Sequence, residues 1–506
     1  MERIYFEKQI FSGLYKGTDP LYIELLSQLK DNKHNFLYPY SHALLLDLKN
    51  DKSDVKYKEL AFIETLIGDN YLAYDSNKKR TVAHLKKPLD AFNEIENEPE
   101  ITFSDISDFF KNIDLSYATD EQKEQMTKGV DLLFNQKIDF GFSKLKDLPD
   151  SISNPVRFIL PIENASMTFM EWIESFMGSL ELMKTDKKSY KGLRNLIDSQ
   201  VNNGKFTVDY NNIDFNDNLK NSVLQKSFID IVNSNLNPNG DKEISDYDFF
   251  VNAYFSLDLL GISKEPSNKV KFNNVLNDGF HSYYGAHCDY VVSADLGFLR
   301  KTRAIYRLLN IDTIVLHVND FIPLFKKLSD NVKIKTTTFI DRIHSDVTYG
   351  LYLNVQANKF DFIIEPRKTH FLHLGYFNKL ESVSKNKRLS VCFSRSTQNY
   401  SDSITYREFE GIVNTAVRIF GADNKFKGEY SWENENKELD NDTWKGRVWK
   451  GSSMSWSLEL NKKTGNLNLI VTYGALTLKE KIVKRWYRYR MHIAKFFKEI
   501  KLNTIR

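Results

Sequence analysis

Four acidic residues, Glu7, Asp47, Asp278 and Asp295, stand where a parallel sheet would gather them. Glu7 follows a short β-prone run near the start of the chain, and Asp295 lies just past a second apolar run. Asp47 falls inside the helix expected after the second predicted strand, and Asp278 is expected to open a helix. Sites in open α/β sheets form outside the carboxyl ends of the strands, so these four side chains are predicted to converge there.

The chemistry of such a cluster follows from its charge. Carboxylates that share a small space raise one another's affinity for protons. A hard divalent cation with oxygen ligands, Mg²⁺ or Mn²⁺, is the usual resolution. Such an ion lowers the pKa of a bound water and clamps a phosphate in line with it. The pattern therefore indicates metal-assisted phosphate chemistry.

The segments that carry the acids resemble the PIN-domain (PilT N-terminus-like) nuclease family. The match consists of Ile4-Tyr5-Phe6-Glu7, Ser41 followed by Asp47, and above all the run from Asn277-Asp278-Gly279 to Ser293-Ala294-Asp295. That run has a helix opening with Asp, a small Ala, a strand ending in Ser and an Asp two residues on. Residues 299–301 and 318–322 continue the resemblance, which covers roughly residues 1–80 and 245–325.

The resemblance implies a Rossmann-like α/β/α sandwich and a metal-dependent ribonuclease. By position, Glu7, Asp47, Asp278 and Asp295 would be catalytic metal ligands, and the hydroxyl of Ser293 would orient a ligand or the scissile phosphate. The family usually carries Asp where this chain has Glu7, and Glu where it has Asp47. The extra methylene moves the oxygens by about 1.5 Å, and the shorter Asp47 partly compensates in our hypothesis.

Each acid also has a purely structural interpretation. Glu7 could be a solvated residue after an edge strand, and Asp47 a polar position on an apolar helix. Asp278 could serve only as a helix N-cap, and Asp295 only as a turn residue before Gly297.

Candidate substrate-binding residues lie in two places. His281, Arg300 and Lys301 are close in sequence to the acids, and His281 follows Asp278 on nearly the same helical face. A partly buried, hydrogen-bonded histidine is the alternative for His281. Near the end of the chain, Lys484, Arg485 and Arg488 are interleaved with aromatic residues and could track an RNA backbone. The alternative is an amphipathic helix with a solvated basic face.

The pattern of the elements predicts an α/β fold in which a helical insertion splits the PIN-like domain. We expect a first half at 1–85, a mainly helical insertion at 86–245, a second half at 246–328, and a C-terminal β-rich α+β domain at 329–506 that ends in a basic helix. The 11 asparagines among residues 201–240 are typical of surface loops. The expected strands are 3–6, 36–38, 290–293 and 313–317, with a hairpin at 456–460 and 467–471. The expected helices are 19–29, 41–48, 103–113, 167–183, 219–232, 249–260, one starting at Asp278, 301–309 and 479–501.

Composition narrows the function classes. Two cysteines exclude a disulfide framework and a Cys-based zinc site, and Cys288 is expected to be a buried small side chain. Basic and acidic residues, 70 and 67, leave a net charge of +3, so global charge does not argue for nucleic-acid binding. Walker-type, GxGxxG, HExxH and GxSxG motifs are absent. Without a signal peptide or a long apolar run, the expected location is the cytoplasm, with no membrane contact.

The function favoured by these observations is a Mg²⁺- or Mn²⁺-dependent endoribonuclease acting on tRNA or mRNA. Its activity would need restraint, as in a toxin or antiviral defence effector, by a regulatory protein partner or by self-association. The main alternative is a catalytically silent PIN-like scaffold that binds RNA or a protein. A DNA nuclease of related fold is a third.

Overall fold

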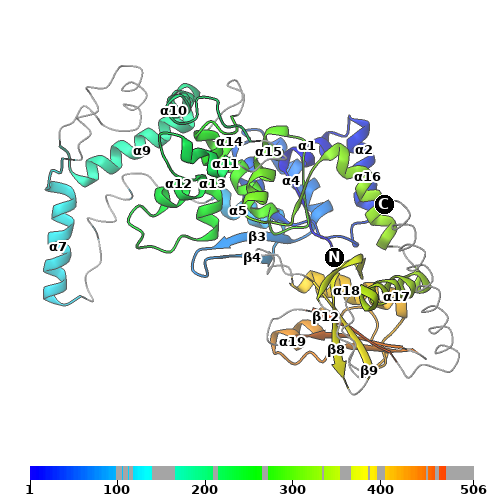
Figure 1. The fold of residues 1–506 in the computed structure, drawn as a ribbon. Helices are drawn as coiled ribbons and strands as arrows, with labels where there is room; N and C mark the ends of the chain where they lie inside the picture. The colour runs from blue at the N-terminus through cyan, green and yellow to red at the C-terminus, as the bar shows by residue number, and fades with distance from the viewer. Residues whose placement is uncertain are drawn as a thin grey trace, which may run out of the picture.

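The computed structural model describes residues 1–97, 105, 112, 118–139, 166–208, 215–264, 272–332, 335–353, 366–385, 388–395, 405–451, 454–461 and 467–473. Figure 1 shows two bodies, a larger one that is mainly helical and a smaller one built on long strands and helices. Two helices, α7 (Asp120–Asn135) and α9 (Phe169–Thr185), project from the larger body. In the described part of the chain, no helix is both long and apolar enough to cross a membrane.

The larger body is organised around three parallel strands in the order β1-β5-β6: β1 (Ile4–Phe6), β5 (Tyr290–Ser293) and β6 (Ile314–His317). The first two are buried along their whole length, as continuous apolar runs in parallel sheets require. Their side chains alternate between two hydrophobic cores, one on each face of the sheet. The predicted α/β class with a parallel sheet is therefore confirmed, as are the strands at 3–6, 290–293 and 313–317 to within a residue.

Helices cover both faces of this sheet. Among the described residues, three of them begin with a side-chain N-cap; Asp19, for example, accepts a hydrogen bond from Leu21 N at the start of the helix predicted for 19–29. One prediction is wrong, because Asp278 lies in the middle of its helix rather than at its start. The helices are α1 (Lys8–Lys16), α2 (Pro20–Asp31), α3 (His42–Asn50), α4 (Val55–Ile67), α13 (Asp246–Leu259), α14 (Phe272–Gly285), α15 (Leu296–Leu308) and α16 (Val318–Val332).

A second, small sheet forms beside the first in the order β2-β3-β4. It comprises β2 (Tyr40–Ser41), β3 (Asn70–Asp75) and β4 (Arg80–Leu85), of which the last two form a hairpin. The strand predicted at 36–38 is reduced to a single parallel bridge between Leu37 and Arg3. Leu37 hydrogen-bonds to Glu2 and Ile4, on either side of Arg3, and the pairing ends before Pro39, which has no N–H to donate.

The segment between the two halves of the sheet is largely helical where described. Its helices, besides α7 and α9, are α5 (Pro88–Glu96), α10 (Lys187–Val201), α11 (Phe215–Asn218) and α12 (Phe228–Leu236). The helix predicted at 167–183 is confirmed, with Thr168 as its N-cap. The prediction of one continuous helix at 219–232 is wrong. The segment begins with a short 3₁₀ helix, η2 (Leu219–Asn221), and a separate helix starts after its N-cap residue Ser227. Of the helix predicted at 103–113, only Asp105 and Asn112 are described.

The asparagine-rich stretch is not only surface loop. Phe215, Leu219, Phe228 and Val232 are buried and belong to the hydrophobic core on one face of the parallel sheet. The interpretation of residues 201–240 as surface loops is therefore wrong for this part. The first two of these side chains are four residues apart, as are the last two, and they anchor the segment, while Asn216, Asn218 and Asn233 lie in α11 and α12 themselves.

The smaller body is a six-stranded antiparallel sheet on which two long helices pack (Figure 1). The predicted hairpin is confirmed, with Trp456 opposite Val471. The basic helix predicted at 479–501 lies outside the described residues. The strands are β7 (Arg367–His373), β8 (Phe377–Lys385), β9 (Arg388–Ser394), β10 (Arg447–Lys450), β11 (Met454–Leu460) and β12 (Leu467–Tyr473), and the helices are α17 (Thr336–Leu353), α18 (Thr405–Phe420) and α19 (Glu435–Asp440).

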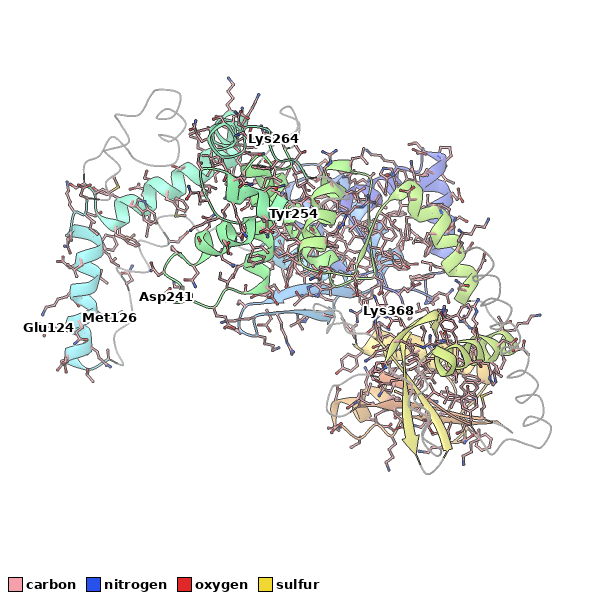
Figure 2. All side chains as sticks on the ribbon, viewed as in Figure 1. Glu124, Met126, Asp241, Tyr254, Lys264 and Lys368 are labelled. Carbon is pink, nitrogen blue, oxygen red and sulfur yellow. The ribbon has the colours of Figure 1, made fainter. Side chains whose placement is uncertain are left out.

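The two bodies meet near the N-terminus of the chain (Figure 1), and ion pairs join them. Arg3, just before β1, binds both carboxylate oxygens of Glu408 on α18 at 2.8 and 2.9 Å. Arg407 of the same helix reaches across to Asp69. Lys368, labelled where the bodies meet in Figure 2, lies 3.4 Å from Asp312.

Candidate acidic site at the strand ends

Glu7 and Asp295 are brought together because their strands are neighbours. β1 and β5 are parallel and adjacent, and Glu7 N donates to Val292 O at 3.1 Å. Ser293 bridges the two acids: its hydroxyl donates to Glu7 Oε2 at 2.5 Å and accepts from Asp295 N at 2.9 Å. The two strands are neighbours, as a convergence of Glu7 and Asp295 requires, and Ser293 contacts a predicted ligand, Glu7.

Both acids stand at helix N-termini, but they use this position differently. The Asp295 carboxylate caps α15 by accepting from Gly297 N at 2.6 Å and Phe298 N at 3.0 Å. Glu7 is the N-cap residue of α1, yet its side chain makes no capping bond. The partial positive charge of each helix end still favours a carboxylate there.

Asp47 enters from α3 and is held by two residues of α14. Asn277 Nδ2 donates to Asp47 Oδ1 at 2.5 Å, and His281 Nε2 lies 3.0 Å from Oδ2. The Asp47 side chain is 30 % exposed, whereas that of His281 is 1 % exposed. The acid therefore reaches toward solvent from a buried support.

His281 continues into a buried hydrogen-bond chain. Its Nδ1 lies 2.7 Å from the hydroxyl of Tyr5 on β1, and this hydroxyl lies 2.7 Å from Ser41 Oγ. The ring of His281 also meets that of Tyr5 edge to face. His281 was predicted to bind substrate; the structure places it inside the protein, as in the buried, hydrogen-bonded alternative.

The pKa of Asp278 responds to the charges of the other three acids. Burial raises the pKa of Asp278 well above its usual range, and only the positive charge of Lys301 opposes this rise among the groups acting on it most strongly. The negative charges of Glu7, Asp47 and Asp295 raise the pKa of Asp278 further. Burial likewise raises the pKa of Glu7, against the opposing effects of His281 and the Ser293 hydroxyl.

The two basic residues predicted to bind substrate have opposite surroundings. Arg300 is exposed on α15 and is free to face a ligand. Lys301 is fully buried, with its ammonium 3.9 Å from Asp258 Oδ1 and over the ring of Tyr254, which Figure 2 labels inside the larger body. A buried ammonium has no surface on which to meet RNA, so the structure makes Lys301 an internal counter-charge. Lys484, Arg485 and Arg488 lie outside the described residues.

A divalent cation fits this site in donor chemistry, since all four acids offer hard oxygen ligands. The geometry is less complete: among the described residues, no three His, Cys, Asp or Glu side chains lie close enough to hold one ion. A shared ion would therefore require a closer approach of the acids than the structure shows. Cys288 is buried as expected, and burial raises the pKa of its thiol.

Several residues that build the site were not predicted as part of it. Tyr5, Ser41 and Asn277 stand within the segments that carry the family resemblance, but their supporting contacts come only from the fold. Asp258, which holds Lys301, gave no signal beyond being an acid between two leucines near the end of its helix. A polar residue in a strand or helix that is buried all round is the pattern that could have indicated such roles.

The fold and the site together define a mixed α/β protein with an acidic cluster at the carboxyl ends of its parallel strands. When the chain is compared with protein-family models, with curated proteins and with solved structures, none of the three comparisons finds a match.

Proposed function

We propose that the protein is a metal-dependent endoribonuclease of the PIN type, which hydrolyses RNA phosphodiester bonds. The observation that supports this proposal is the gathering of four carboxylates from separate elements at the carboxyl ends of β1 and β5. Burial and mutual repulsion make this cluster unfavourable for folding, as the raised pKa of Asp278 indicates. Ionisable groups perturbed in this way cluster at functional sites.

The residues divide into complementary roles. Glu7, Asp47, Asp278 and Asp295 would hold a Mg²⁺ or Mn²⁺ ion, which when bound activates a water and neutralises a phosphate. Ser293 restrains the Glu7 carboxylate through its 2.5 Å hydrogen bond. Exposed Arg300 supplies a guanidinium that can pair with a phosphate of the RNA.

The Glu7 and Asp47 pair departs from the family pattern in opposite senses. In the proposal, the longer Glu7 and the shorter Asp47 compensate for one another. The double swap Glu7→Asp with Asp47→Glu tests this idea, because it restores the usual pattern. The double variant is expected to retain cleavage, whereas each single swap loses part of it. A double variant without activity would count against compensation.

The function itself is tested by incubating the protein with total RNA and with tRNA in Mn²⁺, Mg²⁺ or EDTA. Cleavage is expected with either metal and should be lost in Asp278→Ala/Asp295→Ala. Asp320→Ala is a matched control, because Asp320 follows the neighbouring strand β6 but is exposed and outside the cluster. Equal cleavage by both variants would show that the acidic cluster is not the active site. Single-stranded DNA in a parallel reaction separates a ribonuclease from a DNA nuclease.

A catalytically silent scaffold is the second candidate, and a specific observation favours it. Both oxygens of Asp47 already have partners, Asn277 and His281, and no three acids of the described residues are within reach of one ion. A scaffold would bind RNA or a protein without requiring the cation. RNA binding that is unchanged by EDTA, with no cleavage product, would favour this second function.

An unrestrained ribonuclease in the cytoplasm would degrade the RNA of its own cell. We therefore extend the proposal to a restrained effector of the toxin or defence type, inhibited by a protein partner or by self-association. The smaller body and the basic segment with Lys484, Arg485 and Arg488 are the candidates for RNA choice and control. Removal of those three charges should weaken RNA binding most at low salt.

A further inference from the structure

Three buried polar side chains from three separate elements meet beneath the acidic cluster. Tyr5 comes from β1, Ser41 precedes α3, and His281 lies in α14, and each is at most 1 % exposed. Around them, the core on this face of the sheet is built from apolar and aromatic side chains. Burying polar groups is unfavourable unless they are hydrogen-bonded, and an apolar trio could fill the same space. Their presence therefore points to a role beyond packing.

Ser41 contacts Tyr5 instead of capping its own helix. It is the N-cap residue of α3, a position where a serine hydroxyl normally accepts a hydrogen bond from the helix backbone. Ser227 makes that bond at the start of α12, through Asp230 N at 3.2 Å. Ser41 makes no capping bond, and its hydroxyl is instead 2.7 Å from that of Tyr5.

The chemistry of Asp47 sets the direction of the whole chain. An ionised carboxylate only accepts hydrogen bonds, so His281 Nε2 must donate to Asp47 Oδ2. In the neutral imidazole, Nδ1 then has a lone pair and accepts from the Tyr5 hydroxyl. The Tyr5 oxygen is left to accept from Ser41 Oγ. Each hydroxyl and each ring nitrogen has one consistent assignment.

We propose that Ser41, Tyr5 and His281 form a positioning chain that fixes His281 as its Nε2–H tautomer and thereby holds Asp47 in one orientation toward the acidic cluster. Asn277 supplies the second anchor, since its amide donates to the other Asp47 oxygen and to Ala43 O. His281 and Asn277 thereby restrain both oxygens of the Asp47 carboxylate. What Asp47 then does rests on the proposed function, whereas the hydrogen-bond chain does not.

The tautomer can be measured directly on the full-length, metal-free protein with ¹⁵N-labelled histidine. The His281 ring signals, assigned by their loss in His281→Gln, should show a neutral ring protonated on Nε2. His287, buried in the turn that follows the same helix, serves as an internal comparison because it does not belong to the Ser41–Tyr5–His281 hydrogen-bond chain. A ring protonated on Nδ1, or on both nitrogens at neutral pH, would overturn the assignment.

The effect on the site is measured by Mn²⁺ titration of folded variants. Tyr5→Phe removes one hydroxyl and keeps the ring, and in His281→Asn the side chain is too short to place its amide N–H where Nε2 meets Asp47. Each should weaken Mn²⁺ binding by about 10- to 100-fold, as is usual for residues that orient a ligand. His281→Gln places an amide donor near the position of Nε2 and should restore most of the affinity.

The pattern across these variants separates positioning from folding. If packing alone mattered, His281→Gln and His281→Asn would bind Mn²⁺ alike, and this result would overturn the positioning role. Wild-type affinity in Tyr5→Phe would overturn it as well. If the wild type binds no Mn²⁺, the proposed metal site fails, while the tautomer measurement still tests the chain itself.

Discussion

The buried charges at the two ends of β1 and β5 are arranged in opposite ways. At the amino ends of β1 and β5, Glu408 and Asp289 are paired with the arginines Arg3 and Arg395. At the carboxyl ends, four acids share one environment with a single buried ammonium, Lys301, acting on Asp278. Because the same two strands form both ends, the comparison separates interactions that stabilise the fold from the acidic cluster of the proposed site.

The amino ends are organised for stability. Arg3 binds Glu408 through two hydrogen bonds and donates its backbone N–H to Asp289 at 2.8 Å. Asp289 also receives Arg395 Nη2 at 2.5 and 2.6 Å. Burial alone would raise the pKa of Asp289, but the charge of Arg395 lowers it overall. These pairs clamp the smaller body onto the start of the parallel sheet.

The carboxyl ends are organised differently. The hydrogen bonds there orient carboxylates without cancelling their charge, as Ser293 does for Glu7 and Asn277 does for Asp47. Burial, reinforced by the neighbouring negative charges, raises the pKa of Asp278, so the fold is destabilised locally. Proteins keep such arrangements at functional sites, and the four predictions that follow test this contrast.

The largest effect should come from breaking a pair at the amino end. Arg3→Met leaves the buried Glu408 carboxylate without its partner and should lower the free energy of unfolding by about 3–5 kcal/mol. Urea unfolding measures the loss. Arg407→Met is the matched control, because its pair with Asp69 also joins the two bodies but is partly exposed. That variant should lose about 1 kcal/mol or less of unfolding free energy. Equal losses in the two variants would show that the buried pair does not stabilise the fold more than the partly exposed one.

A second prediction concerns the pH dependence of stability. Burial raises the pKa of Glu2 to about 7, with Asp289 adding to the rise. Because protonated Glu2 is favoured in the folded state, its contribution is complete below the pKa of about 4.3 in the unfolded chain and is lost as pH rises through 7. Between pH 5 and 8 the wild type should lose about 2 kcal/mol relative to Glu2→Gln. Parallel stability curves would contradict the raised pKa.

A smaller effect of opposite sign is expected at the carboxyl end. Asp278→Asn removes a repelled charge and should stabilise the metal-free protein by up to about 1 kcal/mol at pH 8. Asp258→Asn is the comparison: Asp258 pairs with Arg194 and Lys301, both buried, so its loss should destabilise. Thermal unfolding in EDTA measures both. A destabilised Asp278→Asn would mean that the cluster is a structural network rather than a site.

The smallest effect on stability should come from exposed Arg300. Arg300→Ala should change the free energy of unfolding by less than about 0.5 kcal/mol. If Arg300 contacts an RNA phosphate, the variant should bind RNA more weakly and with a salt dependence reduced by about one counterion. RNA binding is measured in the Asp278→Ala/Asp295→Ala protein, with and without Arg300→Ala. Because this protein is expected not to cleave RNA, the difference gives the contribution of Arg300 to binding alone. An unchanged salt dependence would exclude Arg300 from the RNA contact.

The sequence predicts best what local pattern determines. Continuous apolar runs locate β5 and β6, and the position just after a strand locates Glu7 and Asp295 at one edge. Helix boundaries are harder, since α14 begins six residues before Asp278 and leaves that acid inside the helix. The burial of Lys301 could not be predicted, because lysines are rarely buried without partners, and its partner Asp258 lies on another helix.

Contacts between distant segments are a further limit. Arg3 and Glu408 are separated by 405 positions, and no periodicity in either segment indicates the other. The same holds for Tyr5, Ser41 and His281, whose roles depend on three elements packing together. The hydrophobic pattern predicts that a sheet forms, but the polar partners across it depend on side-chain geometry.

The central claim, that the four acids form a cation site, is tested most directly by calorimetric titration of the metal-free protein with Mn²⁺. The wild type should bind Mn²⁺ with defined stoichiometry, and Asp278→Ala/Asp295→Ala should lose that binding while Asp320→Ala keeps it. Identical titrations for the wild type and the double variant, or no binding by the wild type, would contradict the account.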